Sequence, residues 1–174
     1  MRKMYKRSKI EMKKSIYFLL LMLTIILLDQ FSKMKILGYM LSNSEELTLL
    51  PFLNFTLVFN SGVAFGIFSS FGQVVPHIFS LIGLLFGIGL ISWAIITKKH
   101  YFAMTLISAG ALGNAIDRIR LGVVIDFIDV YWKNLHWPAF NIADISICVG
   151  ACIFLYNEFS ESKKRRVLKS KRFS

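Results

Sequence analysis

The sequence contains few residues that could build a disulfide framework or a metal centre. Its two cysteines, Cys148 and Cys152, lie four positions apart on a predicted helix, so their Cβ atoms are separated by about 5–6 Å. That separation is too large for a disulfide. Its three histidines, His77, His100 and His136, are scattered along the chain. The spacing therefore excludes a disulfide between the two cysteines and supports a metal site poorly, so we expect no metal and no cofactor.

Hydrophobic residues occupy 55% of the 174 positions, which is more than an ordinary soluble domain contains. A helix needs roughly 20 mostly apolar residues to cross a bilayer. Four windows are long enough or nearly so: about 15–37, 74–97, 101–118 and 139–159. They predict an all-α membrane protein with four transmembrane helices. No small-x-small cleavage site follows the first window, so we expect a retained helix rather than a removed signal peptide.

The formal net charge of +11 comes from 21 basic and 10 acidic residues, and its distribution argues against nucleic acid as a partner. Lys and Arg gather in the tails 1–14 and 160–174 and between the second and third windows, whereas the connections near 40–73 and 119–138 carry few. This is the positive-inside pattern. We expect one membrane domain, residues 15–159, with both termini in the cytoplasm. The basic tails also suit anionic lipid headgroups, although the positive-inside bias alone explains them.

The connection after the first window predicts a small β-containing element at about 47–69, on the outer membrane face. Apolar and polar residues alternate from Leu53 to Phe59, which is typical of a half-exposed strand. Pro51 precedes this stretch, and a turn is expected after Asn60. The second outer connection, 119–138, is expected to be a loop. Its part from Asp126 to Pro138 is rich in aromatic residues, and we expect it to be an interfacial loop or short helix.

Acidic residues lie inside or directly after the apolar windows. These are Asp29, Asp117, Asp126, Asp129 and Asp144. An ionised carboxylate at membrane depth is costly, so each such acid is a candidate functional residue. The helical rise places Asp29 and Asn114 about 22 Å from the cytoplasmic boundary and Asp144 about 28 Å from it. Acids and amides from three helices are therefore expected to converge in the outer leaflet.

Two neighbouring carboxylates explain such a cluster best. In a low dielectric one pKa rises and the other falls, so one acid acts as a base toward water and the other polarises a carbonyl. That is peptide hydrolysis without a metal or a covalent intermediate, and a serine nucleophile lacks a plausible base. The alternative is a proton-coupled small membrane transporter with Asp29, Asp117 and Asp144 as a relay. A relay would require acids staggered across the bilayer. A membrane scaffold would leave the acids unexplained.

Five segments resemble, in order, the boxes of bacterial lipoprotein signal peptidase (signal peptidase II). They are DQFSK from Asp29, NSGVAF from Asn60, GALGNAIDR from Gly110, VIDF from Val124 and FNIAD from Phe140. The resemblance implies an aspartyl endopeptidase of the bacterial inner membrane. Such an enzyme removes the signal peptide of diacylglyceryl-modified prolipoproteins before the lipidated cysteine and is inhibited by globomycin. Its expected partners are the prolipoprotein and the surrounding membrane lipids. Four spans with an internal site require no second subunit, so we expect a monomer.

The resemblance also assigns roles to individual residues. The catalytic pair would be Asp126 and Asp144, from the fourth and fifth boxes. The polar residues matched around the active site are Asn60, Asn114, Arg118 and Asn141, and the first box contributes Asp29 and Lys33. The third box also contains Asp117. One departure is Val63, where the family usually has alanine, and we expect it to affect the fit of substrate but not the chemistry.

Supporting residues also have structural interpretations. Asp29 and Lys33, four apart on a helix, can pair and cap the bundle, and we favour that role over a chemical one. Asp117 is expected to order the loop that carries Asp126. Arg118 either reaches a substrate carbonyl or phosphate headgroup or has a structural role, and the sequence favours neither.

Asp129 is the rival for catalysis, because it follows Asp126 by three residues. On a helical turn both side chains would face one way, and only the family match separates them. Asn141 precedes Asp144 by three residues, so its amide can orient the acid or hold a substrate carbonyl. The two glycines that bound the segment Gly110–Gly113 are expected to permit close helix packing.

Overall fold

A computed structural model of the chain describes residues 2–43, 46–62 and 74–170. Val63 and the last part of the predicted outer element lie outside the described residues. The elements in chain order are α1 (Arg2–Asn43), β1 (Leu47–Leu50), β2 (Leu53–Asn60), α2 (Val74–Thr97), α3 (Tyr101–Leu121), β3 (Val124–Trp132), β4 (Leu135–His136) and α4 (Ile142–Ser170). The predicted fold class is thus confirmed as mostly helical with a small β element.

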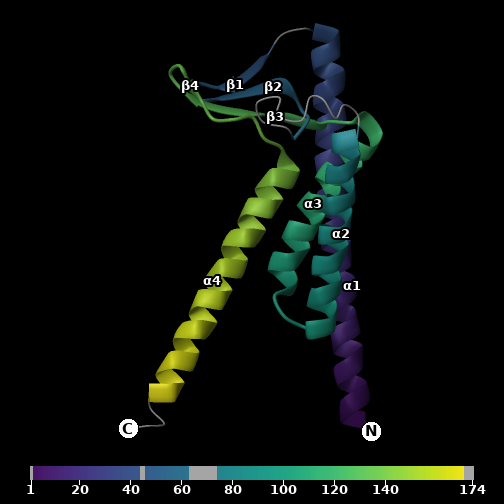
Figure 1. Cartoon of the computed structure of the whole chain (residues 1–174), viewed down its shortest axis with the longest axis vertical. Coiled ribbons are helices and arrows are strands. Elements are labelled where there is room, and N and C mark those ends of the chain that lie inside the picture. Colours follow the sequence, from purple (N-terminus) through teal and green to yellow (C-terminus); the bar gives the residue numbers. More distant parts are fainter. Residues whose placement is uncertain (1, 44–45, 63–73, 171–174) are drawn as a thin grey trace.

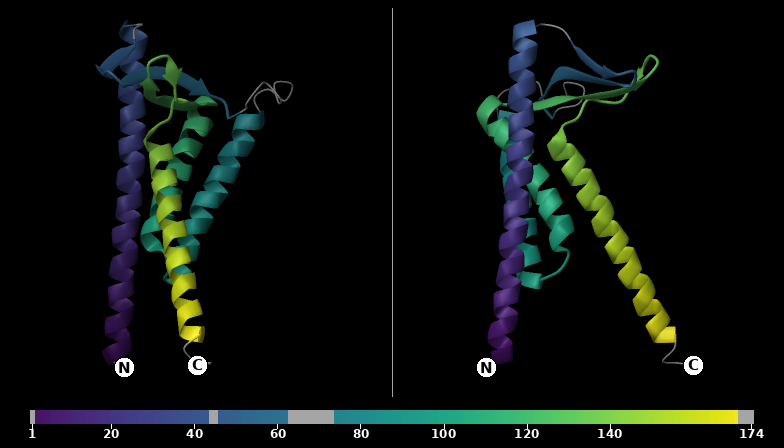
Figure 2. Two further views of the ribbon diagram at one scale, coloured as in Figure 1. Left: turned by 90° about the vertical axis from the view of Figure 1, so that its left-hand side faces the viewer. Right: turned by 180° about the vertical axis from the view of Figure 1, so that it is seen from behind.

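The four helices extend from one end of the molecule, and the strands cover the other end (Figure 1). α1 runs along the full length, α2 and α3 lie beside it, and α4 diverges from the others toward its C-terminal end (Figure 2). The first turn of α1 and the last turn of α4 lie at the same end, away from the strands. Both basic tails therefore lie on one side of the molecule.

Three of the described helices are long and apolar enough to cross a membrane: Ile10–Asn43, Val74–Thr97 and Ile142–Arg165. Large apolar side chains such as Leu20, Leu85 and Leu155 are exposed on them, as lipid-facing surfaces require. α3 is more polar, and most of its residues are buried because it packs against the other three helices. A count of four spanning helices remains a prediction.

The strands form one antiparallel sheet in the order β1-β2-β3-β4. The expected interfacial loop or short helix after Asp126 is therefore wrong, because β3 and β4 occupy this stretch. The run Val124–Ile128 is rich in β-branched and aromatic residues, and β2 provides the backbone partners. In the β2–β3 register Asn60 lies opposite Val124 and Val58 opposite Asp126. This pairing brings the end of β2, including Asn60, close to Asp126.

Two glycines of α3 allow α1 and α4 to approach it closely. A Cβ on Gly110 would collide with the carbonyl oxygen of Ala143 in α4. A Cβ on Gly113 would lie 2.9 Å from Asp29 Oδ2 in α1. The close packing predicted for these glycines is confirmed. It brings polar side chains of three helices within hydrogen-bonding reach of one another.

Candidate active site

Lys33 lies at the centre of a buried polar cluster between α1 and α3. Its ammonium is 2.7 Å from Asp29 Oδ2, 2.8 Å from Asp117 Oδ2 and 3.0 Å from Asn114 Oδ1. A lysine ammonium has three N–H donors, so all three are used. Lys33 is 1% exposed and Asp29 is fully buried, which keeps the cluster from water. The expected pair of Asp29 and Lys33 is present, but it is part of a larger network that the i, i+4 spacing does not reveal.

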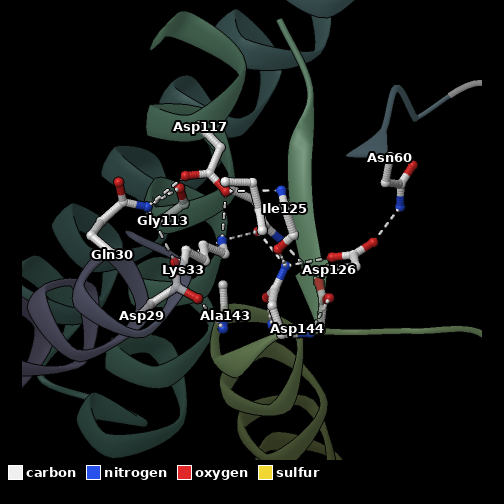
Figure 3. A network of polar contacts seen from close by, with 12 residues as sticks. Asp29, Gln30, Lys33, Asn60, Gly113, Asp117, Ile125, Asp126, Ala143 and Asp144 are labelled. Carbon is white, nitrogen blue, oxygen red and sulfur yellow. Dashed lines mark hydrogen bonds and ion pairs between the residues drawn. The ribbon is translucent and has the colours of Figure 1, made fainter. Parts of the chain in front are cut away.

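The two acids of this cluster also bind backbone next to the two predicted catalytic acids. Asp29 Oδ1 accepts a hydrogen bond of 2.9 Å from the N–H of Ala143, the residue before Asp144. Asp117 Oδ2 accepts one of 3.3 Å from the N–H of Ile125, the residue before Asp126. Figure 3 shows these contacts on either side of Lys33. The cluster thus fixes the backbone from which each acid projects.

Asn114 and Asn141 connect Lys33 to both acids. Because an ammonium can only donate, Asn114 turns its oxygen to Lys33, and its Nδ2 donates to Asp144 Oδ1 at 2.8 Å. Asn141 Nδ2 donates to Asp126 Oδ1 at 2.7 Å and to Asn114 Oδ1 at 3.1 Å. Its Oδ1 accepts the backbone N–H of Asp144 at 2.9 Å. One amide side chain therefore contacts both acids, as the spacing of Asn141 and Asp144 suggested.

The two acids lie in different environments. Asp126 in β3 is 2% exposed, whereas Asp144 in the first turn of α4 is half-buried. Burial raises the pKa of Asp126, and the neighbouring charge of Asp144 raises it further. Hydrogen bonds from Asn60, at 2.9 Å to Oδ2, and from Asn141 act in the opposite direction. Asp126 is thus the member of the pair that holds a proton more readily than an ordinary carboxyl.

We expect Asn60→Ala to shift the alkaline side of the cleavage pH profile to higher pH. The Asn60 amide favours the ionised carboxylate, so its loss raises the pKa of Asp126 and lets the protonated form persist to higher pH. Rates measured across a pH series would show the shift. Asn54→Ala is the matched control, because the Asn54 amide, also on β2, faces Asp129. A profile that is unchanged, or moved to lower pH, would contradict the role of Asp126 as the proton carrier.

Asp129 lies away from this network. It follows Asp126 by three residues on a strand, where side chains alternate between faces, so the expected helical turn is wrong. Its carboxylate is 2.9 Å from His136 Nδ1 and 3.5 Å from Asn54 Nδ2. His136 is in β4 and pairs with Tyr131 in the register of the hairpin. Asp129 thus contributes to the sheet rather than to the paired acids.

Arg118 lies at the edge of the site and makes no salt bridge within the described part of the chain. Its guanidinium carbon is 5.8 Å from the ring centroid of Phe79, and it approaches the backbone of Gly62. Its Nε is buried and has no hydrogen-bond partner among the described residues. Asp117, its neighbour in sequence, binds Lys33 instead. Among the described residues nothing accepts a hydrogen bond from the Arg118 Nε, so this N–H can bind an acceptor atom of a substrate.

Gln30 also belongs to this network, although it was not among the predicted site residues. Its Nε2 donates to Asp117 Oδ1 at 2.8 Å and to the carbonyl of Gly113 at 3.2 Å, and Arg120 donates to its Oε1 at 3.2 Å. Gln30 therefore joins α1 to the second acid of the Lys33 cluster. The available signal was its place beside Asp29 in the first box, which is weak for a single glutamine.

The cysteines and the potential metal ligands add no further site. Cys148 and Cys152 are both free and exposed. Within residues 2–43, 46–62 and 74–170, no group of three or more His, Cys, Asp or Glu side chains is gathered as a metal site requires. Metal-independent chemistry remains a prediction.

Comparisons with known proteins identify the family of the chain. A family model described as signal peptidase (SPase) II matches residues 21–160. A lipoprotein signal peptidase from Polynucleobacter necessarius is 39% identical over 83% of this chain and 90% of its own length. One from Thermodesulfovibrio yellowstonii is 43% identical over 79% and 90%. A bacterial membrane enzyme solved by the in meso method is 29% identical, with a TM-score of 0.67 over 87% of this chain and 91% of its own. The chain, a membrane peptidase, therefore belongs to the signal peptidase II family.

Proposed function

We propose that Asp126 and Asp144 form the catalytic pair with which this signal peptidase II removes lipoprotein signal peptides. The observation that carries the assignment is the Asn141 side chain, which donates to the carboxylate of Asp126 and accepts from the backbone of Asp144. Two acids from separate elements are thereby held by one amide. Paired carboxylates in a partly dry site are the arrangement that lets one act as acid and the other as base.

Hydrolysis then needs no group beyond the two acids and a water molecule. Ionised Asp144 takes a proton from the water as its oxygen attacks the scissile carbonyl carbon, while Asp126 gives its proton to the carbonyl oxygen. When the C–N bond breaks, the proton on Asp144 goes to the leaving amine. The hydroxyl proton of the intermediate returns to Asp126. Both carboxyls thus regain their starting states. The half-buried Asp144 is the one that water reaches more easily.

The supporting residues hold this geometry. Asn114 donates to Asp144, and Asn60 donates to Asp126, so both carboxylates keep a fixed orientation. The Lys33 cluster holds the backbone before each acid. The Arg118 Nε, which has no partner among the described residues, is placed to donate a hydrogen bond to a substrate carbonyl oxygen.

The membrane setting of the proposal comprises four spanning helices with the catalytic pair toward the outer leaflet. α3 is the fourth span: its 21 residues give a length of about 31 Å, close to the hydrocarbon thickness. Four of its polar residues, Thr105, Ser108, Asn114 and Asp117, are buried in the packing with the other helices and do not face lipid. The N-terminal end of α1 and the C-terminal end of α4 lie opposite the sheet, and by the positive-inside pattern their basic residues support a cytoplasmic location for both tails in a bacterial cell. The enzyme acts as a monomer in the inner membrane.

The substrate is a prolipoprotein that carries a diacylglyceryl cysteine and enters sideways from the lipid. We expect purified enzyme in detergent to cut a lipidated precursor far faster than the same precursor without its diacylglyceryl group. The reason is that an aqueous route would forfeit the apolar burial of both the signal helix and the acyl chains. Cleavage rates on the matched pair of substrates measure the difference. Equal rates would rule out the lipid-dependent part of the proposal, and no cleavage of either would reject the proposed substrate.

A further inference from the structure

A cavity lies at the end of the molecule opposite the catalytic pair. It has a volume of about 700 Å³ and opens between the N-terminal part of α1 and the start of α3. Its lining residues are Ile10, Lys13, Lys14, Tyr17, Phe18, His100, Tyr101, Phe102, Ala103 and Asn157. The peptidase chemistry uses none of them. The cavity is therefore separate from the proposed active site.

Four of the ten lining residues, Tyr17, Phe18, Tyr101 and Phe102, form an aromatic part of the wall. Phe18 of α1 stacks on Tyr101 of α3 with ring centroids 5.2 Å apart and planes inclined by 2°. Tyr17 meets Phe18 edge to face at 5.3 Å. The Tyr101 hydroxyl is buried and has no hydrogen-bond partner among the described residues. A buried polar atom without a partner is costly, so a ligand with an acceptor near this hydroxyl would be favoured.

The charged part of the lining is cationic. Lys13 and Lys14 are exposed, and no acid is among the described residues that line the cavity. Lys14 has a long contact of 3.6 Å with Glu11, and Lys13 makes no ion pair within the described part of the chain. His100 is already engaged by Glu158 at 3.0 Å. Two lysines are thus available to an anion at the boundary where the first span begins.

We propose that this cavity binds an anionic phospholipid of the cytoplasmic leaflet. Lys13 and Lys14 contact the phosphate of the headgroup, the Tyr101 hydroxyl donates to an ester or phosphate oxygen, and the acyl chains lie along the aromatic wall. Basic pockets between helices on the cytoplasmic side suit such headgroups. A free phosphate would leave the apolar lining uncovered, whereas an amphiphile matches both parts. The lipid site rests on the proposed membrane orientation and not on the catalytic pair. The lipid site and the catalytic assignment can therefore fail separately.

The test uses the purified full-length chain in detergent. Native mass spectrometry would compare its binding of phosphatidylglycerol and of phosphatidylcholine with identical acyl chains. We expect the wild type to prefer phosphatidylglycerol and the double variant K13Q/K14Q to bind it roughly 10-fold more weakly. Tyr101→Phe should weaken binding several-fold without a change of charge. Excess inorganic phosphate should not displace the lipid.

The matched control is K163Q/K164Q, which removes the same charge from the same end of the molecule but outside the cavity. It should keep wild-type binding, and both double variants should keep prolipoprotein cleavage. An equal loss of lipid in the two double variants would show general surface attraction and overturn the site. Equal binding of the two lipids by the wild type would also overturn the site. Displacement of the bound lipid by inorganic phosphate would do the same.

Discussion

Asp126→Asn and Asp144→Asn should each lower the rate of prolipoprotein cleavage by about 10²–10⁴-fold. Asparagine keeps the size of each side chain and one acceptor for the surrounding amides, but it cannot exchange a proton. Loss of either acid therefore removes half of the acid–base pair, while the single oxygen of asparagine can keep one of the two hydrogen bonds that each carboxylate accepts. The measurement is a timed cleavage assay of a lipidated precursor with purified protein. A chelator should leave the wild-type rate unchanged.

Asp129→Asn is the matched control for these two variants, since it removes a carboxylate from the same strand as Asp126. Its side chain faces His136 and Asn54, so we expect measurable cleavage. Globomycin binding checks that the two inactive variants are folded, and both should retain some of it. If Asp129→Asn were inactive and Asp126→Asn still cut, the catalytic assignment would be wrong.

The acids and amides that the structure brings together could be selected from the sequence because each lies within one of the five boxes. Asp126, Asn141 and Asp144 come together although 15 and 18 residues separate the first from the other two. The helix α2 begins and ends where its apolar window does, at Val74 and Thr97. A continuous apolar stretch between Gln73 and Lys98 leaves little choice of limits. Those limits could therefore be predicted from hydropathy alone.

The β3–β4 region could not be predicted in the same way. Five of the six residues from Val124 to Asp129 are buried, so β3 lacks the polar–apolar alternation of a half-exposed strand. A strand buried on both faces has the same pattern as a short buried helix or an apolar loop. Only the pairing with β2, more than 60 positions earlier, distinguishes these structures. Such a long-range partner is not visible in the local sequence.

The role of Lys33 was underestimated for a related reason. Helical spacing connects Lys33 to Asp29 and to nothing else nearby. Its other two partners, Asn114 and Asp117, lie on α3. They are too far along the chain for helical periodicity to relate them to Lys33. The extra contacts change the expected consequence of removing the lysine, because two acids rather than one would lose their cation.

Lys33→Ala should lower the free energy of unfolding by about 3–5 kcal/mol, as expected when one partner of a buried ion pair is removed. The variant leaves Asp29 and Asp117 facing each other without a cation in a site that water does not reach. Thermal unfolding in detergent would show the loss as a lower melting temperature and reduced yield. Lys35→Ala is the control on the same helix, since Lys35 is exposed and lies over the Phe31 ring, so its loss should change stability by about 0.5 kcal/mol or less.

The surviving Lys33→Ala protein should be partly active, because Lys33 contacts Asn114 and not the reacting acids. Asn114 would keep its hydrogen bond to Asp144 but lose one of the two donors to its oxygen, the other being Asn141. Adding Asp117→Asn to Lys33→Ala removes one of the two uncompensated charges and should recover part of the lost stability. A double variant less stable than Lys33→Ala would show that charge repulsion is not the cause. A Lys33→Ala protein with a normal melting temperature and no cleavage would instead place Lys33 in the catalytic machinery.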